Sequence, residues 1–316
     1  MKLQYRQFCL EHDVPLHHQA WWLDAVCGQD AWTLALATDK GGAITGVLPY
    51  YPTRRYGLPV IQQPPFTTYS GPWLHYPKNA AFKQTSQYAF EKKTYLDLIT
   101  QLPHVAFFQQ NFRPEVTNHL PFFWAGFRQT TRYTYLFEDT SDLEKLVAGF
   151  KNTLRTELKK AAGLVDIGRE DSAFATIFEL NAQSFGRKGQ AAPYRFDIFK
   201  RLHAALAERG HCAGFIARDR RTGAAHAGLY LIHDAQRAAV LLAGIHPEHT
   251  ASNALSALYY EALRFCSARS LSLDFEGSME PGIEHTFRSF GATLTPYFQV
   301  WKAGNKLLEI AFALRK

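Results

Sequence analysis

The sequence repeats part of itself at a fixed distance, and this repeat limits the folds open to it more than any other feature. Residues 95–126 align with residues 260–291 when the numbering is shifted by 165. In this alignment Gly126 meets Gly291. Self-similarity at a fixed spacing is the signature of duplicated structural units. We therefore expect the chain to fold as two related halves.

Each half also contains the same local pattern, a helical segment followed by two short alternating strands around a Gly-containing turn. Alternation of apolar and polar residues is typical of half-buried strands, and Gly beside Asp is typical of tight turns. A further alternating strand closes each half. The strands expected from these patterns are residues 32–37, 43–51, 131–137, 213–217, 224–232 and 294–301.

The second half shows its element order most clearly. After two helices it reads hairpin, strand, helix, strand, helix and strand. The helices are expected at residues 143–163, 194–209, 252–268 and 281–290, and the added strands at 238–246 and 271–276. We therefore predict an α/β (α+β) fold with two tandem domains, each a mixed, mostly antiparallel sheet flanked by helices.

The join between the halves is expected near residue 140, which gives domains of residues 1–140 and 141–316. Ser141 and Glu144 have the S-x-x-E spacing of a capping box, so a helix should start there. Gly163 is expected to end this helix. The 316 residues, of which 47% are apolar, can fill two cores. The buried stripe of the helix should consist of Leu143, Leu146, Val147, Phe150, Leu154 and Leu158.

Composition excludes several classes of protein. No run approaches the ~18 apolar residues of a membrane span, and the start lacks the apolar core of a signal peptide. We therefore expect a cytoplasmic protein with no integral membrane segment. The four cysteines form no CxxC pair and the 13 histidines form no HExxH motif, so neither a disulfide framework nor a metal site is expected.

The charge of the chain is basic and concentrated in the second half. The net charge is +7, and the residues from 141 onward hold 23 Lys and Arg against 18 Asp and Glu. Such an excess attracts polyanions. Lys151, Arg155 and Lys159 are spaced four apart and should share one helix face. This face is either an ordinary solvated surface or a grip for the phosphates of a donor or acceptor.

Short motifs near both ends of the chain resemble those of a known family. They are Leu273-Asp274-Phe275-Glu276-Gly277-Ser278, Gly282-Ile283-Glu284, Phe287-Arg288-Ser289-Phe290-Gly291, Gly46-Val47-Leu48-Pro49-Tyr50, Pro64-Pro65-Phe66 and Tyr69-Ser70-Gly71-Pro72. With the element order of the second half they resemble the GNAT acyltransferase fold. More narrowly, the chain is similar over nearly its whole length to Fem-type proteins, which carry two GNAT domains in tandem.

This resemblance implies transfer of an acyl or aminoacyl group to an amine acceptor, either a small molecule or a cell-wall precursor. The implied donor is acyl-CoA or aminoacyl-tRNA, and no permanently bound cofactor is implied. In GNAT enzymes a Gly-rich turn at the start of a helix holds the carrier's pyrophosphate. Here that place contains Ser252 and Asn253 and no glycine. Free backbone amides there can still bind phosphate, but the missing glycines and the basic second half favour tRNA as the carrier.

The strand expected at residues 271–276 carries the candidates for proton transfer. Alternation should place Asp274 and Glu276 on one face. The shift of 165 aligns them with Gln109 and Asn111, and an amide cannot take up a proton at neutral pH. We therefore predict that the chemistry belongs to the second half, with Glu276 as the base and Asp274 in support.

Arg288 stands where Fem-type relatives often have lysine, so the resemblance implies support at a developing oxyanion. The alternative is a surface cation near a helix end. The carboxylates also have a structural alternative, in which Asp274 caps the following loop and Glu276 pairs with Arg288 or Lys302.

Two loops offer candidates for substrate binding. Glycines flank Arg187 and Lys188, and Tyr194 follows, which is typical of a loop that closes on an anionic acceptor. An ordinary surface loop explains these residues as well. In the first half, Tyr69 lies in a proline-rich loop that either lines an acceptor groove or packs in the interior.

The leading hypothesis is an N-acyltransferase or aminoacyltransferase whose first domain binds the acceptor and whose second domain performs the transfer. Its catalytic residues are Glu276, Asp274 and Arg288. The carrier's phosphates would lie on Lys151, Arg155, Ser252 and Asn253. From another functional class, the alternative is a catalytically inactive binding module that kept the fold.

Overall fold

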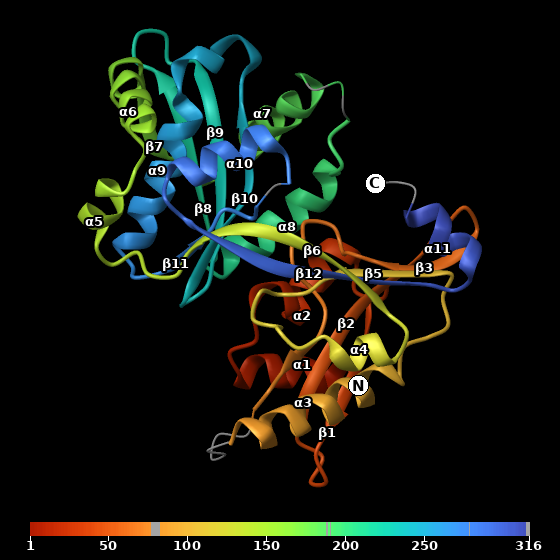
Figure 1. The fold of residues 1–316 in the computed structure, drawn as a ribbon. Coiled ribbons are helices and arrows are strands. Elements are labelled where there is room, and N and C mark those ends of the chain that lie inside the picture. The colour runs from red at the N-terminus through yellow and green to blue at the C-terminus, as the bar shows by residue number, and fades with distance from the viewer. Residues whose placement is uncertain (77–82, 188, 190, 278, 314–316) are drawn as a thin grey trace. The chain divides into compact units, whose positions relative to one another are not determined.

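The computed structural model describes residues 1–76, 83–187, 189, 191–277 and 279–313, without the side chains of residues 187 and 311–313. The chain forms two compact units (Figure 1). The first contains Met1–Arg132 and Pro296–Lys316, and the second contains Tyr133–Thr295. The limits fall inside two long strands, β6 (Arg128–Phe137) and β12 (Thr293–Ala303). None of the helices in the described ranges has the length and apolarity that a bilayer crossing requires.

The first unit is a mixed sheet with helices packed on it. Its further elements are α1 (Lys2–Glu11), η1 (Leu16–His18), α2 (Ala20–Cys27), β1 (Thr33–Thr38), β2 (Ile44–Arg55), β3 (Leu58–Gln62), β4 (Trp73–Leu74), α3 (Gln84–Ile99), β5 (Phe107–Asn111), α4 (Leu120–Trp124) and α11 (Lys306–Ala313). The strand order is β1-β2-β3-β5-β12, and β4 pairs with β2. The described pairs are antiparallel except β3 with β5.

The core of the first unit lies between this sheet and the helices α3 and α4. Leu98 of α3 and Phe122 of α4 join Phe108 of β5 in one buried cluster. Gly46 lets α3 approach β2, because a Cβ atom there would lie 2.5 Å from Cγ2 of Thr94. Burial of these large apolar side chains is the main favourable term that fixes the helices on the sheet.

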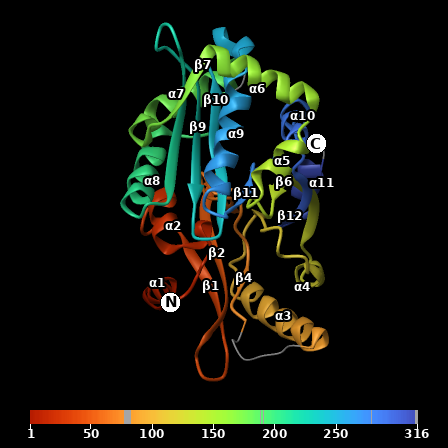
Figure 2. The same ribbon diagram turned by 90° about the vertical axis from the view of Figure 1, so that its left-hand side faces the viewer.

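The second unit has a longer sheet with helices on both faces. Its elements are α5 (Leu143–Ala148), α6 (Asn152–Leu164), β7 (Val165–Arg169), η2 (Asp171–Ala173), α7 (Phe174–Arg187), α8 (Phe196–Glu208), β8 (Cys212–Asp219), β9 (Ala225–His233), β10 (Arg237–Ile245), η3 (Pro247–Ser252), α9 (Ala254–Ser267), β11 (Ser272–Asp274) and α10 (Pro281–Ser289). The order is β6-β11-β10-β9-β8-β7, with β10 and β11 parallel and the other pairs antiparallel. In Figure 2, α7 and α8 lie on one side of β8–β10 and α9 on the other.

Three glycines on neighbouring strands let α7 pack unusually close to the sheet. Gly214, Gly228 and Gly244 belong to β8, β9 and β10. A Cβ atom at Gly228 would lie 3.0 Å from Ile177 of α7, and one at Gly244 would lie 2.3 Å from the backbone nitrogen of Asn181. Because backbone atoms cannot move aside as a flexible side chain can, a side chain at residue 244 would push α7 off the sheet.

The internal repeat is present in the structure. Shifting β6 by 165 residues gives 293–302, which is β12 without its last residue. Gly126 and Gly291 both follow a helix and have positive φ angles of 82° and 78°. The pairing pattern also repeats, since β1-β2-β3-β5 and β8-β9-β10-β11 each consist of two antiparallel pairs followed by a parallel pair.

The single helix expected over residues 143–163 is wrong. Two helices, α5 and α6, replace it, and the break lies at Gly149 to Lys151. Phe150 at the break is 3% exposed, and its ring meets that of Phe290 with centroids 5.2 Å apart. The break therefore lets an aromatic side chain enter the core, where its burial outweighs the lost helical hydrogen bonds.

The predicted helix ends also shift by one residue. The N-cap of α5 is Asp142, whose carboxylate accepts a hydrogen bond from the Lys145 N–H at 3.0 Å, and not Ser141. Gly163 does not end α6, which continues to Leu164. Short-range capping patterns predict that a helix begins here, but two adjacent capping residues compete for the position.

The division into units differs from the predicted domains, residues 1–140 and 141–316, at both ends. The second half of β12 pairs with β5, so Pro296–Lys316 belongs to the first unit. The end of β6 pairs with β11, so residues 133–140 belong to the second. The pairing partners of the two closing strands, which lie far away in sequence, set these limits.

We expect the buried histidine His18 to make the stability of the protein fall with acidity. It is fully buried, and Nε2 lies 3.0 Å from the carbonyl oxygen of Gly71. Burial, helped by the Arg113 cation, lowers the pKa of His18 to about 3. The unfolded chain, with a pKa near 6.5, therefore takes up the proton first, and stability is lost as pH falls below about 6.5. At pH 5 this group alone should cost about 2 kcal/mol.

Urea unfolding at pH 7 and pH 5 tests this expectation. His18→Gln should be less stable at pH 7 but should show a smaller loss between the two values. His104→Gln, on an exposed loop, should keep the wild-type loss. An unchanged pH dependence in His18→Gln would contradict the assignment.

Candidate functional site

The candidate site of the second unit lies where a parallel strand pair ends. β10 and β11 pair only over Arg237–Ala239 and Ser272–Asp274 in the described residues. β11 then stops, while β10 continues to Ile245. The carboxyl ends of parallel strands are where α/β sheets bind ligands, because the strands part there and loops follow.

Beyond this point the backbone of β10 is irregular. Val240 pairs with Leu231 and Leu242 with Tyr230, so Leu241 is an extra residue in the ladder. Such a bulge redirects backbone groups and is common beside active sites. Beyond the pairing with β11, a side chain of α7 provides a hydrogen-bond partner for the backbone of β10. Asn181 donates to the Ala243 carbonyl at 2.8 Å. The sequence pattern gave no sign of the bulge, because one added residue hardly changes an apolar run.

Asp274 is fully buried at the end of β11 and holds the following turn. The Thr134 hydroxyl donates to Asp274 Oδ1 at 2.5 Å, and the Glu276 N–H donates to the same oxygen at 2.8 Å. The Gly277 N–H donates to Thr134 Oγ1 at 2.8 Å. Asp274 therefore caps the turn that follows β11, as the structural alternative predicted. Sequence reasoning missed Thr134, whose partner lies 140 residues away.

Glu276 leaves the strand instead of continuing its alternation. Its φ is 52°, in the left-handed region that costs a residue with a side chain about 1–2 kcal/mol. The shared face predicted for Asp274 and Glu276 is therefore wrong, because the strand ends at Asp274. Backbone strain of this kind gathers at functional sites. The Asp274 carboxylate, which binds the Glu276 N–H, holds the strained residue in place.

Glu276 lies within electrostatic range of Tyr194, which precedes α8. Burial and the nearby Glu276 carboxylate raise the pKa of the Tyr194 phenol. The Tyr194 ring meets that of Phe185 at the end of α7, with centroids 6.4 Å apart. Glu276 and Tyr194, a predicted base and a predicted substrate-binding residue 82 positions apart in the sequence, therefore interact electrostatically. A carboxylate can accept a proton, and a neutral phenol can donate one, so the two side chains offer one group of each kind.

Arg288 lies on the surface of α10 and is paired. Its Nε donates to Glu284 Oε1 at 2.8 Å, and the same oxygen accepts the Tyr135 hydroxyl at 2.6 Å. Hydrogen bonds from Arg288 and then from Tyr135 lower the pKa of Glu284. Lys302 donates to the Ala125 carbonyl at 2.8 Å. Arg288 and Lys302 thus have recorded partners other than Glu276. The pairings proposed for Glu276 with them are not among the described contacts.

The basic face predicted around Lys151 is not a single helix face. Lys151 is the N-cap of α6, and its N–H donates to the Ser289 carbonyl at 2.9 Å. The Arg155 guanidinium donates to the Ala148 carbonyl at 2.5 Å and so closes the break between α5 and α6. Both side chains are exposed, but Arg155 has a structural partner.

The start of α9 has the backbone shape of a Gly turn without glycine. Asn253 is the N-cap, with φ 55° and ψ 20°, a left-handed conformation that Asn tolerates better than most residues. The buried Ser252 hydroxyl accepts from the Ala254 N–H at 3.3 Å. In the first turn, the Ser256 hydroxyl donates to Glu157 Oε2 at 2.9 Å. A carboxylate of α6 therefore already lies where a helix start attracts an anion.

A group of histidines precedes this helix. The rings of His226 and His249 stack with centroids 3.8 Å apart, and His246 lies 5.0 Å from His249. Burial and then the neighbouring His249 lower the pKa of His226. The Asp219 carboxylate acts in the opposite direction and raises it. Among the described residues, no group of three or more His, Cys, Asp or Glu side chains is arranged to hold a metal ion.

The remaining predicted substrate residues are Tyr69, Arg187 and Lys188. Tyr69 is 3% exposed, and its ring packs on Tyr297 of β12 with centroids 5.2 Å apart, both within the first unit. Tyr69 therefore fits the alternative in which its side chain packs in the interior. Arg187 ends α7, but its side chain and all of Lys188 lie outside the described residues.

The hydrogen bonds of Thr134 yield a test of the Asp274 turn. Thr134→Val keeps the shape of the side chain but leaves the buried Asp274 carboxylate and the Gly277 N–H each short of a partner. We expect a loss of about 2–4 kcal/mol in the free energy of unfolding, measured with urea. Thr131→Val, on the same strand, removes only an exposed 3.4 Å contact and should cost far less. Equal stability of the two variants would refute the positioning role of Asp274.

Comparisons with known proteins agree with this geometry. Residues 148–281 match the family model of the acetyltransferase (GNAT) domain. A search of curated proteins by sequence finds no match. The chain is similar in structure to FemX, with a TM-score of 0.66, 12% identity and coverage of 94% of this chain and 95% of that one.

Two further solved structures share the fold over nearly the whole chain. One is L-PGS from Bacillus licheniformis, with a TM-score of 0.56, 9% identity and coverage of 98% and 95% of the two chains. The other is the C-terminal domain of a protein named as a lysylphosphatidylglycerol synthetase, from Agrobacterium fabrum, with a TM-score of 0.53, 12% identity and coverage of 99% and 94%. Glu276, Tyr194, Asp274 and the β10 bulge all lie inside the matched segment. Residues 148–281 of the second unit thus match the GNAT acetyltransferase domain, and the chain shares its fold with FemX over nearly its whole length.

Proposed function

We propose that the second unit transfers an acyl or aminoacyl group from a phosphate-rich carrier to an amine acceptor. The observation that carries this proposal is the left-handed backbone of Glu276, which the buried Asp274 carboxylate holds just beyond the end of β11. Glu276 and Tyr194 both lie in the segment that matches the GNAT domain, and the Glu276 carboxylate helps to raise the pKa of the Tyr194 phenol. Acyl transfer to an amine requires a base for the nucleophile and an acid for the leaving group, and these two side chains supply one of each.

The proton transfers follow from the two side chains. The amine attacks the donor carbonyl as the neutral base, and Glu276 takes the proton that the nitrogen loses as the N–C bond forms. The C–S bond of a thioester, or the C–O bond of an aminoacyl ester, then breaks. The Tyr194 phenol, which its raised pKa keeps protonated, donates to the departing sulfur or oxygen. The proton held by Glu276 then restores Tyr194, directly or through solvent.

The carbonyl oxygen needs a donor while it carries negative charge. The bulge removes Leu241 from the β10 ladder, and its N–H is the candidate donor. Arg288 is a weaker candidate, because Glu284 already neutralises its charge and its side chain is 57% exposed. Asp274 acts through the turn that it holds, since the turn fixes the backbone of Glu276.

Aminoacyl-tRNA is favoured over acyl-CoA as the carrier. Glu157 places a carboxylate in the first turn of α9, so a pyrophosphate there would meet a like charge. The second half of the chain has the larger basic excess, which suits a polyanion. The acceptor in this proposal is an amine on a small molecule or a cell-wall precursor.

Glu276→Gln should abolish most turnover without disturbing binding of the donor. Loss of the base should lower kcat by about 10²- to 10⁴-fold, measured with charged tRNA and an amine acceptor. The acidic limb of the pH–rate profile should disappear with it. Glu144→Gln, an exposed carboxylate on α5, should leave kcat unchanged. Normal turnover by Glu276→Gln would remove it as the base. Failure of the wild type to bind any donor would favour an inactive binding module.

Glu157→Gln should strengthen binding of CoA. Removing the carboxylate from the first turn of α9 removes a repulsion of about 1 kcal/mol, so calorimetry should show CoA binding about fivefold more tightly. Ser256→Ala breaks the same hydrogen bond but keeps the charge and should have a smaller effect. Micromolar binding of CoA by the wild type, unchanged in Glu157→Gln, would overturn our preference for tRNA.

A further inference from the structure

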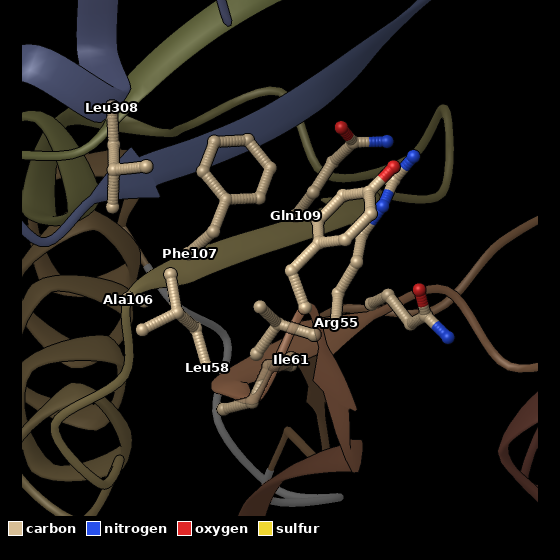
Figure 3. Close-up of a pocket in the computed structure, with 10 residues that line it drawn as sticks. Arg55, Leu58, Ile61, Ala106, Phe107, Gln109 and Leu308 are labelled. Atoms are coloured by element: carbon tan, nitrogen blue, oxygen red, sulfur yellow. The ribbon is translucent and has the colours of Figure 1, made fainter. Parts of the chain in front are cut away.

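The first unit has an apolar cavity on the face of its sheet that α3 and α4 do not cover. Phe108 points into the helix-covered core, so its neighbours Phe107 and Gln109 point to the opposite face. There they line a cavity of about 260 Å³. Figure 3 shows Leu58 and Ile61 of β3 and Leu308 of α11 around it.

An open groove continues from this cavity along α11. Its volume is about 490 Å³, and it shares Leu58, Ala106 and Leu308 with the cavity. Leu307 and the backbone before α11, at Gly304 and Asn305, form its far wall. The two hollows therefore form one apolar channel with an open side.

Large apolar side chains stand exposed around this channel. At the tip of the β2–β3 hairpin, Tyr56 is 85% exposed and Leu58 is 45% exposed. On α11, Leu307 is 79% exposed and Ile310 is 57% exposed. Single exposed apolar residues are ordinary, but three that line these hollows, with Ile310 one helical turn beyond Leu307, mark a surface that binds something apolar.

The charge at this rim is positive and available. Arg54, Arg55 and Lys306 are all exposed. In the described residues Arg55 has one recorded contact, the Tyr56 ring 5.7 Å away, and it has no acidic partner. Glu309 on α11 is paired with Arg128 at 3.2 Å. Arg54 donates a hydrogen bond to the Gly57 carbonyl at 2.8 Å, which leaves its charge in place. The surface thus combines apolar side chains with cationic groups for which no acidic partner is recorded among the described residues.

We propose that this surface, formed by the hairpin residues 54–58 and α11, docks on an anionic lipid bilayer. One lipid's acyl chain enters the channel, and its phosphate lies at Arg55. α11 has eight residues, on the order of 12 Å, and so lies in the interface instead of crossing the ~30 Å core. A second copy of this chain is a poorer occupant, because its net charge of +7 would repel the basic rim.

Vesicle flotation with the full chain tests this proposal. The wild type should bind vesicles of equal parts phosphatidylcholine and phosphatidylglycerol, but not phosphatidylcholine alone, and salt should weaken binding. The double variant Arg54→Gln/Arg55→Gln should lose about thirtyfold in the partition coefficient, since each cation near an anionic surface contributes about fivefold. Leu307→Ser/Ile310→Ser should lose at least about tenfold, with the salt dependence kept.

Matched controls come from the same unit. Leu10→Ser, at a side chain 82% exposed on α1, and Lys40→Gln, on an exposed turn, should bind as the wild type does. Circular dichroism should show that all variants remain folded. Equal binding by wild type and both double variants, or equal binding to neutral vesicles, would refute the proposal. A dimer that Leu307→Ser/Ile310→Ser dissociates would assign the surface to a second copy instead.

This inference goes beyond the proposed transferase activity. Flotation needs no turnover, so Glu276→Gln should bind vesicles as the wild type does. A wild type that binds vesicles but transfers no acyl group would refute the proposed function alone. A wild type that transfers the group but does not bind vesicles would refute only the membrane surface.

Discussion

Each half of the sequence ends in a strand that completes the other half's sheet, and the rest of the structure depends on this exchange. β12, at the end of the second half, pairs with β5 in the first unit, and Lys302 lies opposite Phe108. β6, at the end of the first half, pairs with β11 in the second, and Phe137 lies opposite Leu273. A shift of 165 residues converts one register into the other. The register of a strand is set by the face on which each side chain must be buried. Both copies keep the same register, so the exchanged strand belongs to each sheet as fully as the neighbouring strands do. A cut near residue 140 would leave both sheets with an unpaired edge.

The candidate site also depends on the exchanged strand β6. Thr134 and Tyr135 lie on β6, in the sequence of the first half, yet Thr134 holds Asp274 and Tyr135 binds Glu284. The backbone of Tyr135 also accepts the Phe275 N–H at 3.0 Å. These contacts place Glu276 in its left-handed conformation, so the position of the proposed base is set by a strand from the other repeat. Buried hydrogen bonds of this kind are costly to break, since each unpaired group loses its partner without regaining water.

Local patterns predicted most elements because those elements carry their own periodicity, and they failed where distant contacts decide. The strands at 213–217 and 224–232 and the helices at 252–268 and 281–290 appear within a few residues of their expected limits. The break at Phe150 was not predictable, because the continuous 3–4 spacing hides the packing against Phe290 that interrupts the helix. Alternation placed Asp274 correctly as a polar residue in a strand but misplaced Glu276, since alternation holds only while the strand lasts. The electrostatic interaction of Tyr194 with Glu276 joins residues 82 positions apart in the sequence, and no local pattern predicts it.

The two copies of the repeat have separated their roles at equivalent positions. In the second copy, the strand ends at Asp274, and an ionisable side chain follows in a strained backbone. In the first copy, β5 continues through Asn111, whose amide donates to the Thr68 carbonyl and accepts from Gln299 at 3.0 Å. At these positions of the first copy the strand is regularly paired and its backbone is not strained. Amides stand where the second copy has carboxylates, and an amide cannot take up a proton at neutral pH. Gln109 instead borders an apolar cavity. The equivalent sheet positions of the two copies therefore differ in both backbone and side-chain chemistry, and the proposed base has a counterpart without a titratable side chain in the first copy.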